Sequence, residues 1–388
     1  MEKKYANEQN ILLLVALLKA HGIKRVIASP GTTNLSFVAS LQCDSFFEMY
    51  SCVDERSAAY MAVGMAAETN EPVVITCTGA TASRNYLSAL TEAYYRKLPI
   101  LVVTGTQNPE RIGQLHSQII DRRVTQNDVL VSSYMVDTVR DQQDSYFCQL
   151  KINQAIDDLT KNGGGPVHIN LKTGYTRDFS VSELPLVKIM KRVGYDNITS
   201  APSLPVGRIG IFIGSHNTFS EELTESVDKF CSSCNAVVFC DHTSGYYGKY
   251  KVNFSLVTIQ KQAIYDLCEL DLCIHLGEIS AEYGSLSDHL LKKNVWRVSP
   301  DGVIRDQFTK LTYLFDMEEA DFFRFYTCEN SGNCDSYYHK CRDLYERIVS
   351  KMPEIPFSNV WIASILSSKL PKGSCLHLGI LNSTRTWN

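Results

Sequence analysis

Short, continuous apolar runs alternate with stretches of helical periodicity along the first half of the chain. Four of these runs predict buried strands, at residues 25–29, 46–53, 72–78 and 99–104, and a fifth follows at 166–171. Helical stretches separate them, for example at 35–41, 85–96 and 141–161. Strands without polar alternation are typical of a parallel sheet that helices cover on both faces. The pattern therefore predicts a doubly wound α/β domain.

The first apolar segment, residues 11–18, predicts a buried amphipathic helix. Asn7 is placed to cap its start, and Gly22 is placed just past its end. Polar residues separate the apolar run from Lys3 and Lys4, which does not fit a signal peptide. Eight apolar residues are also too few to cross a bilayer. We therefore expect a soluble, cytoplasmic protein that does not associate with a membrane.

The pattern changes near the middle of the chain and then starts again. Between residues 173 and 206 no clear period remains, which indicates an interdomain linker. Further apolar runs at 208–214, 236–240, 270–276 and 295–298 predict a second parallel α/β domain. A helix at 359–370 and a strand at 374–379 look like the beginning of a third domain. We therefore expect two doubly wound, mainly parallel-sheet domains and part of a third: 1–182, a linker at 183–205, 206–350, and 351–388.

Small and polar residues follow the predicted strands of the first domain. Pro30, Gly31 and Thr32 come after the first strand, and Thr78 and Gly79 end the third. Ligands of open α/β sheets bind at this carboxyl edge. After the second strand, Asp54 and Glu55 open a helix rich in alanine and glycine. Carboxylates suit the positive end of a helix dipole, so Glu55 has a purely structural interpretation beside a catalytic one.

Composition narrows the class of protein and of site. The net charge is -4 and 21% of residues are charged, with no basic run, so nucleic acid is not an expected partner. The thirteen cysteines lie scattered, mostly inside apolar runs. This distribution favours buried free thiols in a reducing cytoplasm over a disulfide framework. The sequence assembles no metal site of its own.

Five motifs in fixed order carry a family resemblance. They are SPG at 29–31, DER at 54–56 with the Ala/Gly helix, TG at 78–79, EAYYRKLPILVVTG at 92–105, and GPVHINL at 165–171. Together they resemble the pyrimidine-binding domain of thiamine diphosphate (ThDP) enzymes. Within that superfamily the chain most resembles the menaquinone-pathway 2-succinyl-5-enolpyruvyl-6-hydroxy-3-cyclohexene-1-carboxylate synthases.

The resemblance implies a cofactor, a reaction and a set of residues. In this family a glutamate at the position of Glu55 hydrogen-bonds N1′ of the ThDP aminopyrimidine, so Glu55 is expected to be catalytic and partly buried. Cofactor-binding roles are implied for residues at the strand ends, namely Pro30, Gly31, Thr32, Thr78 and Gly79. Gln118 matches a glutamine that faces the reacting centre. The expected reaction is non-oxidative decarboxylation of a 2-oxo acid, for which 2-oxoglutarate is a candidate, with carboligation to an acceptor.

Two departures from the family limit what the resemblance implies. An arginine that binds the acceptor's carboxylate in the family is absent here, where the chain has Thr32, Thr33 and Asn34. The identity of the acceptor is therefore not fixed. Three alternative functions also remain: an acetolactate-synthase-like carboligase, a split 2-oxo acid decarboxylase subunit, and an inactive relative that keeps the fold.

The second departure concerns Mg²⁺ and the diphosphate, which the family holds through a Gly-Asp-Gly motif that this sequence lacks. We expect that site on a missing domain or on a partner chain, and the chain itself to be truncated. The family's sites lie between subunits, so we expect a homo-oligomer, either a dimer or a tetramer, or a partner subunit that carries the diphosphate-binding domain.

Overall fold

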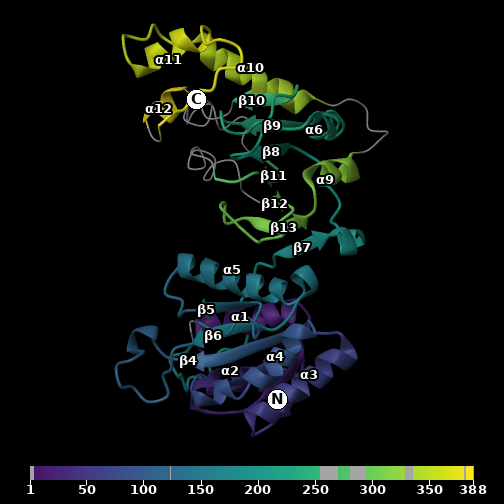
Figure 1. Ribbon diagram of the computed structural model, residues 1–388, viewed down its shortest axis with the longest axis vertical. Helices are drawn as coiled ribbons and strands as arrows, with labels where there is room; N and C mark the ends of the chain where they lie inside the picture. Colours follow the sequence, from purple (N-terminus) through teal and green to yellow (C-terminus); the bar gives the residue numbers. More distant parts are fainter. Residues whose placement is uncertain are drawn as a thin grey trace. The chain divides into compact units, whose positions relative to one another are not determined.

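The computed structural model describes residues 4–122, 124–253, 270–279, 294–327, 335–379 and 382–387. The chain divides into two compact units, Met1–Ile189 and Met190–Asn388. Each unit contains one sheet with helices around it (Figure 1). All the strand pairs of both sheets are parallel, which confirms the predicted α/β class.

The first unit is built on a six-stranded sheet in the order β2-β1-β3-β4-β6-β5. Its strands are β1 (Arg25–Ala28), β2 (Glu48–Ser51), β3 (Val73–Thr78), β4 (Ile100–Thr106), β5 (Ser132–Val136) and β6 (Val167–Lys172). Its helices are α1 (Gln9–Ala20), α2 (Leu35–Gln42), α3 (Glu55–Thr69), α4 (Leu87–Tyr95) and α5 (Gln142–Asp158). Short 3-10 turns are η1 (Thr32–Asn34), η2 (Thr81–Arg84), η3 (Pro109–Arg111) and η4 (Lys161–Gly163).

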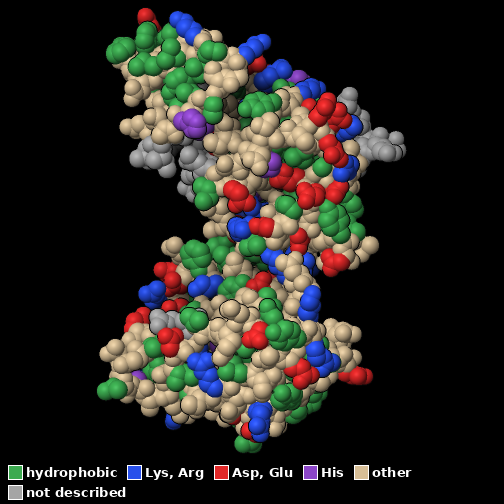
Figure 2. Space-filling model, viewed as in Figure 1, with side chains coloured by type: hydrophobic (Ala, Val, Ile, Leu, Met, Phe, Trp, Pro, Cys, Tyr) green, Lys and Arg blue, Asp and Glu red, His purple; other side chains and the backbone are tan. Residues whose placement is uncertain are grey.

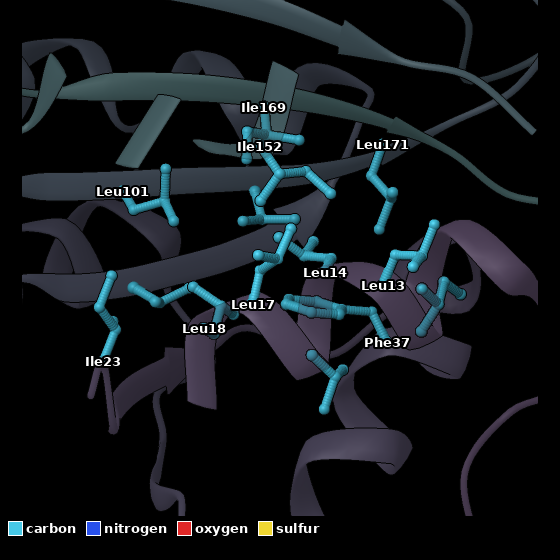
Figure 3. Packing of buried hydrophobic residues seen from close by; sticks show 14 of the residues in the cluster. Leu13, Leu14, Leu17, Leu18, Ile23, Phe37, Leu101, Ile152, Ile169 and Leu171 are labelled. Carbon is cyan, nitrogen blue, oxygen red and sulfur yellow. The ribbon is translucent and has the colours of Figure 1, made fainter. Parts of the chain in front are cut away.

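Alternate residues of the central strands point to opposite faces of this sheet, and each face has its own core. On β4, Leu101 packs in the cluster that α1, α2 and α5 cover, whereas Val102 packs against α3 and α4. Figure 3 shows the first cluster, in which leucines of α1 meet Phe37 of α2 and Ile152 of α5. Because both faces are buried, these strands have the continuous apolar sequences from which they were predicted.

The N-terminal helix lies where the sequence predicts it, but Asn7 is not its cap. The residue at the N-cap position is Glu8, whose side chain makes no capping bond. Asn7 instead donates its side-chain amide to Asp178, at 2.8 Å. Gly22 has a φ of +75° beyond the helix end, in agreement with the prediction. No helix in the described part of the chain is long and apolar enough to cross a membrane.

The second unit has a seven-stranded sheet in the order β10-β9-β8-β11-β12-β13-β7. The strands are β7 (Lys191–Gly194), β8 (Ile209–Ile213), β9 (Ala236–Cys240), β10 (Lys251–Asn253), β11 (Leu272–Leu276), β12 (Val295–Val298) and β13 (Leu311–Asp316). The helices are α6 (Glu221–Cys234), α9 (Glu319–Tyr326), α10 (Ser336–Ser350), α11 (Asn359–Ser367) and α12 (Asn382–Trp387), with the turn η5 (Tyr195–Ser200).

Two boundaries differ from the sequence prediction. The segment predicted as a linker, 183–205, contains strand β7, which pairs with β13 at the edge of the second sheet. The division between the units falls at Ile189, before this strand. The strand expected at 374–379 does not form, because among the described residues no neighbouring strand pairs with this exposed segment. Helix α11 does form at the predicted place.

Candidate functional site

The carboxyl ends of β2, β1, β3 and β4 lie next to one another at one edge of the first sheet, because these four strands are parallel neighbours. The turn after β1 touches the end of β3 directly. A Cβ atom added to Gly31 would lie 2.3 Å from Cγ2 of Thr78, so only glycine allows the two segments to pack this closely. The predicted cofactor residues of these two strands therefore form one continuous surface.

Buried Asn34 holds the turn after β1 in place. Its side-chain oxygen accepts from the backbone N–H of Gly31 at 2.8 Å, and its side-chain nitrogen lies 3.3 Å from the carbonyl of Ser29 and 3.2 Å from the hydroxyl of Thr76. Thr33 accepts from the backbone N–H of Gly79, at 3.3 Å. Thr33 and Asn34 thus link the loops together. Pro30 and Thr32 are exposed at the surface of the turn.

Asp54 and Glu55, the two carboxylates at the start of α3, have different roles. Asp54 is the N-cap residue, and its carboxylate accepts from the backbone N–H and the hydroxyl of Ser57, both at 2.8 Å. These hydrogen bonds lower the pKa of Asp54. Glu55 is therefore not needed to cap the helix, although it lies in the first turn, where its charge also suits the helix dipole.

Glu55 is half-buried and faces the loop that follows β3. Its Oε2 accepts from the side-chain amide of Asn85, at 3.1 Å. Ser29 donates its hydroxyl to the carbonyl of Cys52, at 2.7 Å, and so joins the end of β1 to the segment that leads into Glu55. Arg56 points away and is exposed. The structure thus brings Glu55 to the same edge as the Gly31 turn and Thr78.

The groups beneath Glu55 are held in their neutral forms. Burial raises the pKa of the Cys77 thiol to about 12, and the charge of Glu55 adds to this effect. Burial also raises the pKa of the Tyr86 hydroxyl well above its ordinary value. A thiol and a phenol with such pKa values stay protonated near neutral pH, so neither places a charge beside the Glu55 carboxylate.

Gln118 lies in the segment that follows η3. It is exposed on the long connection between β4 and β5 and has a φ of +60°. Within the described part of the chain, no hydrogen bond joins its side chain to Glu55 or to the loops after β1 and β3. Its expected position facing a reacting centre stays a prediction.

Two residues of the first unit were not singled out from the sequence. The sequence predicted Asn85 only as the first residue of a helix. The one feature that could have indicated another role was its polar side chain after residues 81–84. Arg122 is one of two adjacent arginines in a polar segment, which normally indicates solvent exposure, yet its side chain is 6% exposed. Only the folded structure reveals that burial.

Comparison with known proteins assigns this edge of the sheet to a family. Residues 12–127 match the N-terminal TPP binding domain of thiamine pyrophosphate enzymes, and they include the strand-end turns and Glu55. This segment of the chain is therefore similar to the domain with which those enzymes bind thiamine pyrophosphate, which is ThDP.

Several similar curated proteins are 2-succinyl-5-enolpyruvyl-6-hydroxy-3-cyclohexene-1-carboxylate synthases. The chain is 28% identical to this enzyme from Bacteroides thetaiotaomicron, over 96% of the chain and 69% of the relative. It is 26% identical to the enzymes from Bacteroides fragilis and Phocaeicola vulgatus, in each case over 98% of the chain and 70% of the relative. The similarity thus extends through both units of the chain.

Proposed function

We propose that this chain forms the pyrimidine-binding side of a ThDP site and takes part in the decarboxylation of a 2-oxo acid with carboligation. The observation that carries the proposal is the position of Glu55. Its carboxylate is released from helix capping by Asp54, is held by Asn85, and lies at the sheet edge formed by the Gly31 turn and Thr78. The family match over residues 12–127 supports the same site.

The residues at this edge fit the aminopyrimidine half of ThDP. Close packing of Gly31 on Thr78 leaves backbone and small side chains along the edge, and a planar ring can lie against such a surface. Glu55 would hold a proton at N1′ of the ring, and Asn85 would keep the carboxylate in position. When bound, ThDP supplies a thiazolium that takes up the electron pair released by decarboxylation.

We assign Mg²⁺ and the diphosphate to a separate diphosphate-binding region, on a partner subunit or a further domain. Among the described residues, no three His, Cys, Asp or Glu side chains cluster in a way that would hold a metal ion. The chain corresponds to about 70% of the length of its relatives. A homo-oligomeric or two-component assembly in the cytoplasm is part of this proposal, and the ten cysteines in the described residues, all free thiols, are compatible with a reducing compartment.

For the substrates, we propose 2-oxoglutarate as the donor. The name of these relatives contains a succinyl group, which is what 2-oxoglutarate leaves after loss of CO₂. We expect the turn after β1 to recognise the acceptor without a positive charge. Thr33 and Asn34 hold the loops together there, and they provide no cation for a carboxylate. Comparing turnover of 2-oxoglutarate, pyruvate and sulfopyruvate would separate this proposal from an acetolactate-synthase-like carboligase and a dedicated decarboxylase.

The decisive experiment compares Glu55→Gln with Glu110→Gln, an exposed carboxylate on the same unit. CO₂ release from 2-oxoglutarate is measured with ThDP and Mg²⁺, on the chain supplied with the part of the Bacteroides thetaiotaomicron relative that it does not cover. We expect Glu55→Gln to lower turnover by about 100-fold or more, because glutamine cannot exchange a proton with the ring. Glu110→Gln should retain full turnover. Equal activity of the two variants would refute the role of Glu55, and no turnover by the supplemented wild type would refute the proposed activity.

A further inference from the structure

A second cavity lies on the first unit, at the carboxyl ends of β4, β6 and β5 and under the connection that follows β4. These three strands are neighbours in the sheet (Figure 1). The cavity has a volume of about 310 Å³, which is in the range of small-molecule sites. Its lining contains none of the residues assigned above to the ThDP site. It is therefore a separate feature of the fold.

One part of the cavity wall is apolar and the other is polar. The apolar part consists of Pro109, Ile112, Ile119, Ile120 and Met135, and the polar part of Thr106, Arg122, Ser133 and Asn170. Such a wall suits a small ligand with an apolar body and a single polar group.

Arg122 is the one cation among the described residues of this lining, and it is buried without a counter-charge from any of them. Its side chain is 6% exposed, and in the described part of the chain no carboxylate pairs with it. Nε donates to the side-chain oxygen of Asn170, at 3.1 Å, but Nη1 is buried with no hydrogen-bond partner. A buried, unpaired guanidinium is costly, and a built-in anion partner would normally compensate it.

The guanidinium is fixed in place rather than free to turn toward solvent. Its Nη1 and Nη2 atoms lie 2.5 and 2.7 Å from the point where a Cβ on Gly79 would be, so it packs directly on the Gly79 backbone. Asn170 is held in turn by contacts with Ser133, at 3.3 Å, and with the His168 ring, at 3.4 Å. Burial lowers the pKa of Arg122 to about 10, which still leaves it charged at neutral pH. The cavity therefore presents a positioned cation.

We propose that this cavity binds a small carboxylate with an apolar body, with the carboxylate beside the Arg122 guanidinium and the body against the isoleucines and Met135. A carboxylate is favoured over a phosphate because the wall offers one cation and five apolar side chains. The proposal does not depend on the 2-oxo acid chemistry proposed above. It assigns Arg122 to a site of its own, next to the Gly79 loop.

The test uses isothermal titration calorimetry on the full chain with benzoate, its uncharged analogue benzamide, and inorganic phosphate. We expect benzoate to bind at one site, and benzamide and phosphate to bind about tenfold more weakly or worse, because only benzoate combines a charge-assisted hydrogen bond with an apolar body. Arg122→Met should weaken benzoate binding by a similar factor. Arg111→Gln, which removes an exposed arginine of the same connection, should leave it unchanged, and so should Glu55→Gln.

Two further measurements separate a binding role from a structural one. Thermal unfolding should show that Arg122→Met is as stable as the wild type or more stable, because the variant removes an unpaired buried charge. Met135→Trp, which fills the cavity and keeps Arg122, should abolish benzoate binding. The proposal is overturned if the wild type does not bind benzoate at millimolar concentration, if phosphate binds more tightly than benzoate, or if either cavity variant binds benzoate as the wild type does.

Discussion

Neighbouring residues of like chemistry take different roles in this structure, and geometry decides which. Asp54 and Glu55 are both carboxylates at a helix start, and the sequence alone cannot say which one caps the helix. Asp54 has extended backbone angles and bonds Ser57, so it takes the capping role. Glu55, one residue later, points its carboxylate to Asn85 instead. The strand-end position of Glu55 was predictable, but its freedom from capping was not.

His168 on β6 gives a prediction for the pH dependence of stability. It is fully buried beside Thr104, whose hydroxyl is 2.8 Å from Nε2, and burial lowers the pKa of His168 to about 3. In the unfolded chain a histidine has a pKa of about 6.5. Unfolding therefore takes up a proton below pH 6.5, and the stability from the neutral ring, full above that pH, is lost as the pH falls toward 3. Between pH 7 and pH 5 we expect a loss of about 2 kcal/mol from this residue.

The measurement is the free energy of unfolding in guanidinium chloride at several pH values, followed by circular dichroism. His168→Gln keeps a partner for Thr104 but does not titrate, so its stability should fall less steeply between pH 7 and pH 5 than that of the wild type. His116→Gln, on an exposed residue, should leave the wild-type slope unchanged. Equal slopes for His168→Gln and the wild type would show that His168 does not set the acid sensitivity.

At the scale of elements, the predictable strands are the central ones. β1, β3, β4 and β6 are rich in apolar residues because helices cover both faces of the sheet, and all four were predicted. The missed strands β5, β7 and β10 lie at sheet edges, where β7 carries Lys191 and Arg192. Edge strands tolerate polar and charged side chains, so they resemble loops in sequence. β13, beside β7, was missed with it.

Two glycines of the first unit, one packed tightly and one in open space, give opposite predictions for substitution by alanine. A Cβ on Gly105 would lie 2.0 Å from the carbonyl oxygen of Thr33, so Gly105→Ala must displace the backbone of the turn. We expect a loss of about 1–3 kcal/mol in the free energy of unfolding. Gly64, inside helix α3, has no atom within 4 Å of its Cβ position. Gly64→Ala should therefore stabilise the chain by about 0.5–1 kcal/mol, because alanine favours the helix.

Urea unfolding of both variants checks this pair under the same conditions. The opposite signs are the informative result, since the chemical change is the same in both. A stable Gly105→Ala variant would mean that the contact between β4 and the η1 turn is looser than the structure indicates. A destabilised Gly64→Ala variant would mean that this position of α3 lies against something outside the single chain.

At the scale of the whole molecule, the two parallel sheets and their α/β class were predictable, whereas the limits of the units were not. Each sheet needs its own core, and two sets of apolar runs imply two cores. The limit between them depends on whether residues 183–205 join a sheet, and that depends on pairing between β7 and β13, which are far apart in sequence. The region around Arg122 depends on similar long-range packing, through Asn170 and Gly79.

Exposed hydrophobic side chains on the first unit bear on how the chain assembles. Hydrophobic side chains reach its surface among the charged ones (Figure 2). Around α3 and α4 they include Val53, Tyr60, Met61 and Tyr95, of which Val53 is 88% and Tyr95 is 70% exposed. Apolar side chains grouped on neighbouring helices are typical of an interface, and these lie on the helices next to Glu55. We propose that a second copy of the chain covers them.

Sedimentation velocity over a range of protein concentrations tests this assembly. We expect the wild type to form at least a dimer, and the double variant Tyr60→Glu with Met61→Glu to sediment as a monomer, because two buried and unpaired carboxylates would oppose association. Phe325→Glu, which changes an exposed aromatic residue on α9 of the second unit, is the matched control and should assemble as the wild type does. A wild type that stays monomeric at every concentration, or a double variant that still assembles, would exclude α3 as the interface. Loss of assembly in both variants would point instead to a general effect of added charge.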